Sequence, residues 1–153
     1  MAVPGEAIGD GIADLLGIEP GMVVQTRNWG LGTACLDGVR AVLERHRGGE
    51  LLDESADEII DVVLLCWREG DGEGAGEGED DLVDALMDAM GNLDDVGWIW
   101  LITPEAGHGG QLASDELAEA VPAAGLVRTG GHSLGDGWRA IRLTWPPWRR
   151  TWR

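Results

Sequence analysis

The stretch IIDVVLLC, residues 59–66, is a nearly continuous apolar run that is rich in β-branched side chains. A strand that is covered on both faces has this composition, and such strands are typical of parallel sheets. Residues 22–26 (MVVQT) and residues 98–103 (WIWLIT) also have the character of buried strands. We therefore expect a parallel sheet that is built around residues 59–66.

Helices are expected between these strands, because apolar residues recur there at helical spacing. A short amphipathic helix is expected within the first 17 residues. Glycines follow the later helical segments, as they commonly do at helix ends, and Ser114 is placed to cap the last helix. The three later segments are Leu36 to Leu43, Leu82 to Met90 and Leu117 to Val121.

The end of the chain predicts an antiparallel pair. Residues 127–129 and 138–145 have strand character and are joined around Gly135-Asp136-Gly137, where the Asp-Gly pair is a hairpin signal. Alternating strands and helices predict right-handed crossovers with helices on both faces of the sheet. The fold class is thus α/β, a small, mostly parallel sheet that closes with the hairpin, in a single domain over residues 1–145.

The chain is strongly acidic. Its 153 residues include 28 acidic and 11 basic residues, for a net charge of -17, and every basic residue is Arg. The absence of Lys excludes Schiff-base and P-loop chemistry. The acidic body would repel phosphates, so no DNA partner is expected. No apolar run is long enough to span a bilayer, and no signal peptide is recognisable. These features predict a cytoplasmic protein.

Residues 69–81 (EGDGEGAGEGEDD) are acidic, rich in Gly and of low complexity, so we expect a flexible loop. A calcium loop of the EF-hand pattern starting at Asp71 fails, because Ala75 and Leu82 occupy ligand positions. The Cys and His residues lack the spacing of zinc ligands. No metal site is expected.

Four segments carry a resemblance to a known family. They are LGIEPGMVVQ (16–25), LLDESADEIIDVVLLCWREGDG (51–72), DLVDALMDAMGNLDDVGWIWLITPEAG (81–107) and AEAVPAAGLVRT (118–129). Together they resemble domain-of-unknown-function family 3052, an actinobacterial family, over residues from about 15 to 145. The resemblance implies a trimmed methyltransferase-like Rossmann fold but no established activity. The family usually has Lys after the Thr-Pro pair, whereas this chain has Glu105.

Candidate ligand-binding residues follow the strands, because ligands of open α/β sheets bind at the carboxyl ends of the strands. Gly30 and Gly32 offer a G-x-G turn whose amides could approach a phosphate or carboxylate. An acidic ligand for a ribose is not evident, although Asp53 or Glu54 could serve. The full candidate set is Trp29, Gly30, Gly32, Arg68, Glu105 and His108.

Residues 146–153 form a basic tail that contains Trp and Arg and no acidic residue. It could fold back on the acidic body, dock on a protein partner, contact RNA or anionic lipid, or be a modified peptide carried by a folded leader. Docking is supported because Trp and Arg are enriched at interface hot spots. The candidate partner-binding residues are Trp148, Arg149, Arg150, Trp152 and Arg153.

The sequence favours a non-catalytic binding or regulatory module on a degenerate methyltransferase-like fold. Such a module would engage a protein partner through its strand-end loops or its tail, and no cofactor would be needed. The alternative is a small S-adenosylmethionine-dependent transferase with the cofactor at Trp29, Gly30 and Gly32. No catalytic residue can be named, and the sequence does not determine the oligomeric state.

Overall fold

The computed structural model describes residues 14–28, 34–53, 55–68, 78–105, 114–135 and 137–146. Its strands are β1 (Val24–Arg27), β2 (Ile60–Cys66), β3 (Leu93–Pro104), β4 (Val127–Gly135) and β5 (Trp138–Thr144). Its helices are α2 (Ala34–Arg47), α3 (Gly78–Met90) and α4 (Ser114–Ala123).

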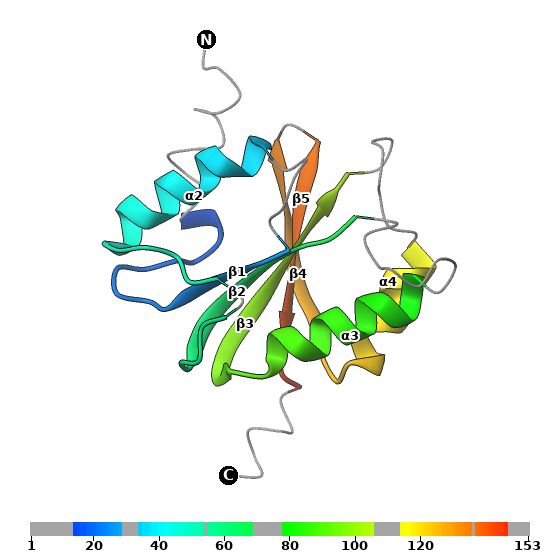
Figure 1. Ribbon diagram of the computed structural model, residues 1–153. Helices are drawn as coiled ribbons and strands as arrows, with labels where there is room; N and C mark the ends of the chain where they lie inside the picture. Colours follow the sequence, from blue (N-terminus) through cyan, green and yellow to red (C-terminus); the bar gives the residue numbers. More distant parts are fainter. Residues whose placement is uncertain are drawn as a thin grey trace.

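The strands form one sheet in the order β1-β2-β3-β5-β4 (Figure 1). β1, β2 and β3 are parallel, whereas β5 is antiparallel to both of its neighbours, β3 and β4. β4 consequently runs in the same direction as β3. The expected fold class, a mostly parallel α/β sheet that closes with an antiparallel hairpin, is confirmed.

Helices cover both faces of the sheet, as expected. α2 packs on one face, where Val39 and Leu43 join a cluster that includes Val62 and Leu64 of β2. α3 and α4 pack on the other face, which we call the α4 face (Figure 1). Residues of β2 therefore alternate between two cores, and this explains why nearly every position of that strand is apolar. The α4 face of β2 presents Ile60, Val63 and Leu65.

A single residue outside the named strands extends the sheet beyond β1. Leu52 pairs with Gln25 in parallel orientation, on the side of β1 that is away from β2. Its amide donates to the carbonyl of Val24, and its carbonyl accepts from the amide of Thr26, both at 2.8 Å. From β1 the chain passes through α2 to the Leu52 segment on one side of β1. From β2 it passes through α3 to β3, which lies on the other side. The strand order reverses between β1 and β2, and such a reversal is the ligand-binding point of open α/β sheets.

The expected bounds of three segments need correction. α3 begins at Gly78, so the prediction of a flexible loop over residues 69–81 was wrong for residues 78–81. The three acidic residues at positions 79–81 lie in the first turn of α3, where negative charge is favoured by the helix dipole. Residues 69–77 lie outside the described residues, as does most of the helix expected in the first 17 residues.

β3 and β4 are also longer than the expected strands of residues 98–103 and 127–129. Leu93 pairs with Ile60 and Trp98 pairs with Val62, so one residue of β2 faces four residues of β3. These four residues, 94–97, form a bulge in β3. Trp145 holds the bulge in place, because its Nε1 donates to the carbonyl oxygen of Asp94 at 2.9 Å. Asp and Gly residues in the bulge conceal this part of the strand in the sequence.

Candidate functional site

The carboxyl ends of β1 and β2 are joined by Asn28, which directly follows β1. Its backbone has a φ of 60°, in the left-handed region that Asn tolerates better than most residues. Its Nδ2 donates to the carbonyl oxygen of Cys66 at 2.9 Å. The two strand ends are thereby fixed relative to one another at the point where the strand order reverses.

Asp53 lies on the other side of β1, at the carboxyl end of the segment that pairs through Leu52. Its backbone carbonyl accepts a hydrogen bond of 2.9 Å from Nε2 of Gln25 in β1. Its exposed carboxylate accepts at Oδ1 from the amide of Ser55 at 2.9 Å and from the Ser55 hydroxyl at 2.5 Å. Both hydrogen bonds use Oδ1, so Oδ2 is the oxygen that can meet a ligand.

The neighbours of Asp53 favour the ionised form of its carboxylate. The Ser55 hydroxyl, followed by the Ser55 amide, lowers the pKa of Asp53 below its ordinary value of 3.8, and the positive charge of Arg40 adds a smaller effect. A pKa that is lower in the folded protein stabilises the fold above the unfolded pKa, and this contribution disappears as the pH falls through the folded value. Asp53 is therefore a negative charge throughout the physiological range.

Replacing Ser55 by Ala should raise the pKa of Asp53 toward 3.8, because the largest cause of the lowering is removed. The pKa can be measured by following the side-chain carboxyl carbon in an NMR titration. Ser55→Thr, which keeps a hydroxyl, should leave the pKa low. An unchanged pKa in Ser55→Ala would show that the Ser55 hydroxyl does not hold the carboxylate.

A small hollow adjoins the reversal point on the α4 face. It has a volume of about 140 Å³ and lies between the ends of β1 and β2 and the side of α3. Ligand pockets usually measure at least about 300 Å³, so this hollow alone is smaller than a usual small-molecule site. The lining residues are Arg27, Asn28, Leu65, Trp67, Ala85 and Asp88.

A second polar group lies at the carboxyl ends of the parallel strands, directly after β3. Oε1 of Glu105 accepts a hydrogen bond of 2.8 Å from the hydroxyl of Ser133 in β4. The amide of Glu105 donates to the carbonyl of Gly137 at 2.7 Å. Glu105 thus ties the end of β3 to the hairpin.

The structure places two of the candidate residues from the sequence. Arg68 is half-buried just after β2, and Glu105 is half-buried just after β3. The two residues therefore follow neighbouring parallel strands at one edge of the sheet. The other candidates lie outside the described residues, namely Trp29, Gly30, Gly32, His108, Trp148, Arg149, Arg150, Trp152 and Arg153.

Two buried polar atoms at this edge were not singled out from the sequence. The hydroxyl of Thr103 and Nε of Arg139 have no hydrogen-bond partner among the described residues. Thr103 in β3 and Arg139 in β5 are direct cross-strand partners. Only the strand register brings them together, and no spacing in the sequence reveals it.

A family model described as "Protein of unknown function (DUF3052)" matches residues 13–147, nearly the whole chain. The chain belongs to this family. An uncharacterized protein of Mycobacterium tuberculosis is 48% identical over 131 residues, which are 86% of this chain and 76% of the relative. An uncharacterized protein of Mycobacterium bovis shows the same identity and coverage. The resemblance expected from the sequence is confirmed.

Solved structures, methyltransferases among them, share the fold of this DUF3052 protein. The mitomycin 7-O-methyltransferase MmcR is 15% identical, with a TM-score of 0.58 over 94% of this chain and 52% of its own. The pyocyanin biosynthetic protein PhzM is 15% identical, with a TM-score of 0.60 over 89% of this chain and 53% of its own. This chain spans about half the length of both proteins. A methyltransferase of Aquifex aeolicus, 11% identical, matches over 98% of its chain with a TM-score of 0.57. At these identities the likeness shows the fold alone.

Two kinds of feature are absent from the described residues. No group of three or more His, Cys, Asp or Glu side chains there is arranged to hold a metal ion. In the same part of the chain, no helix has both the length and the apolar character that are needed to cross a membrane.

Proposed function

We propose that this DUF3052 protein is a binding module that holds S-adenosylmethionine, or its demethylated product, at the reversal between β1 and β2. The observation that carries the proposal is the position of Asp53. Its carboxylate is exposed and stands at the carboxyl end of a strand segment that neighbours β1. In dinucleotide-binding sheets, an acidic residue at this point accepts hydrogen bonds from ribose hydroxyls.

The described residues fit a ribose-containing ligand. Oδ2 of Asp53 can accept from a ribose hydroxyl, while Ser55 holds the carboxylate in one orientation through Oδ1. Asn28 fixes the neighbouring strand end, so the ligand would meet a rigid edge. Bound S-adenosylmethionine would supply an electrophilic methyl group. The role of this chain would be to bind and orient the nucleoside part.

Binding is favoured over catalysis because two of the polar side chains at the carboxyl ends of the strands hold strand ends together. Asn28 bonds to the end of β2, and Glu105 bonds to Ser133 of β4. A transferase is the second candidate. It is supported by Glu105, since this carboxylate lies at the same edge of the sheet as Asp53 and could take a proton from an acceptor.

Replacing Asp53 by Asn should weaken the binding of S-adenosylmethionine and of its demethylated product. The charged acceptor of the ribose hydroxyl is lost, so we expect affinity to fall by roughly tenfold. Titration calorimetry measures this directly. Thermal shift is a first screen, because a ligand at about 100 times its dissociation constant adds about 2.7 kcal/mol of stability.

Asp57→Asn is the matched control, since Asp57 is an exposed acid of the same connection and its replacement removes the same charge. This variant should bind as the original protein does. Equal losses in the two variants would show a general charge effect and would contradict a specific role of Asp53. Failure of both nucleosides to bind the original protein would overturn the proposal itself.

A further inference from the structure

A groove separates α4 from the free edge of the sheet, on the α4 face. It has a volume of about 400 Å³, within the usual range of small-molecule sites. Most of its lining is apolar, and two guanidinium groups interrupt it. The lining residues are Leu117, Ala118, Val121 and Pro122 of α4, Leu126, and Val127, Arg128 and Arg139 of the last two strands.

Arg139 contributes buried hydrogen-bonding capacity that the described residues leave unused. Its Nε is buried and has no partner there, and the same is true of the hydroxyl of Thr103, a fully buried residue. Thr103 and Arg139 face each other on neighbouring strands, so their side chains leave the sheet on the same face, close together. Buried polar groups without a partner are rare and costly. Two of them side by side indicate that a polar group belongs there.

Arg128 brings a second positive charge to the groove. It pairs with Leu143, a residue of the core on the α4 face, so its side chain leaves the sheet on that face. Gly131 follows on the same strand and has no side chain. An Nη atom of Arg128 lies 3.5 Å from the place where a Cβ of Gly131 would be. The guanidinium therefore lies along the strand and on the side of the groove.

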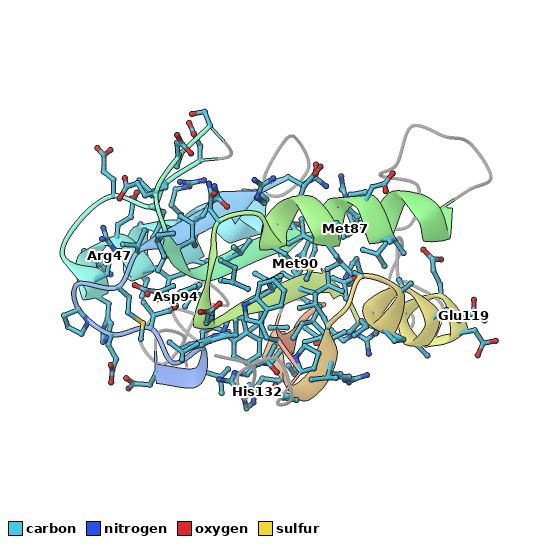
Figure 2. The ribbon with its side chains drawn as sticks, turned by 90° about the horizontal axis from the view of Figure 1, so that it is seen from below. Arg47, Met87, Met90, Asp94, Glu119 and His132 are labelled. Carbon is cyan, nitrogen blue, oxygen red and sulfur yellow. The ribbon has the colours of Figure 1, made fainter. Side chains whose placement is uncertain are left out.

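Two carboxylates of this region, those of Glu105 and Glu119, are directed elsewhere (Figure 2). Oε1 of Glu105 is taken by the hydroxyl of Ser133, which is the other cross-strand partner of Arg139. Glu119 of α4 is exposed and points away from the molecule (Figure 2). Two cations beside an apolar groove, in a chain whose net charge is -17, are complementary to an anion that carries an apolar body.

We propose that the groove between α4 and the β4 edge binds a small amphipathic carboxylate. Its alkyl chain or single aromatic ring would pack against Leu117, Val121 and Leu126, and its carboxylate would accept hydrogen bonds from Arg139 and Arg128. This site is on a different part of the sheet from the proposed nucleoside site, and the two proposals can fail independently.

Octanoate and octan-1-ol are suitable probes, because they share the apolar chain and differ in the charge of the head group. Titration of the full chain, followed by amide NMR shifts, should show octanoate binding at least about tenfold more tightly than octan-1-ol. The shifts should concentrate at residues 117–128 and around Arg139. Equal affinity for the two probes, or shifts elsewhere, would overturn the proposal.

Variants test the two parts of the site separately. Arg139→Gln should lower octanoate affinity about tenfold, and Arg128→Gln, at an exposed position, should also lower it. Ala118→Trp should block the groove from the exposed side of α4 and abolish binding of both probes. Arg142→Gln is the matched control, because Arg142 lies on the opposite face of β5, over the ring of Trp98 at 4.7 Å. Octanoate affinity that is equal in Arg128→Gln, Arg139→Gln and Arg142→Gln would also refute the site.

Discussion

Replacing Gly97 by Ala is expected to destabilise the protein strongly. A Cβ at this position would lie 2.6 Å from the carbonyl oxygen of Asp61, 2.9 Å from Cδ1 of Leu93 and 3.2 Å from the carbonyl oxygen of Asp94. Two of these neighbours are backbone atoms, which cannot turn away as a side chain can. We expect a loss of about 3 kcal/mol, or a decrease in melting temperature of roughly 6–12 °C for a chain of this size.

Gly130→Ala is the control for this prediction. The nearest atom to its new Cβ would be Cβ of Arg142 at 3.9 Å, an ordinary contact. This variant should melt within a few degrees of the original protein, because the added methyl group meets no obstacle. Similar melting of Gly97→Ala and Gly130→Ala would mean that the start of β3 does not approach β2 as closely as described.

Replacing Leu86 by Ala is the second change with a large expected effect. Leu86 in α3 is 0% exposed and belongs to the core on the α4 face. Truncation of a buried Leu leaves a cavity and costs about 2–5 kcal/mol. Chemical denaturation should show this loss as a lower midpoint with an unchanged slope, since the same surface is exposed on unfolding.

Met87 provides the control on the same helix. It is 54% exposed and lies on the outer side of α3 (Figure 2). Met87→Ala should change the free energy of unfolding by less than about 0.5 kcal/mol. Comparable losses in the two variants would contradict the orientation of α3 on the sheet.

The sequence predicted the strands and helices that have a strong periodic pattern. Residues 59–66 are apolar because β2 is buried on both faces, and this one run indicates a central parallel strand. The start of α3 was missed because acidic and Gly residues without apolar periodicity form its first turn. The pairing of Leu52 with β1 was also missed, since a strand of one residue has no period to recognise.

The candidate site was predicted only in outline. The rule that ligands bind at strand carboxyl ends selected Arg68 and Glu105, and both follow parallel strands at that edge. The sequence could not show that Asp53, rather than another acid, stands beside β1, because this depends on the Leu52 pairing. The cross-strand pairing of Thr103 with Arg139 depends on strand register, which local spacing in the sequence does not determine.

The direction of β5 decides at which end of the sheet the described part of the chain finishes. β5 is antiparallel to β3, so its last residue, Thr144, pairs with Trp98 in the first part of β3. Trp145 is then fixed to Asp94, and the chain leaves the sheet at the end opposite Asn28 and Asp53 (Figure 1). A protein that binds this end of the sheet, around Asp94 and Trp145, would therefore not compete for space with a nucleoside at the opposite end. The two could occupy the molecule simultaneously, as a ternary complex.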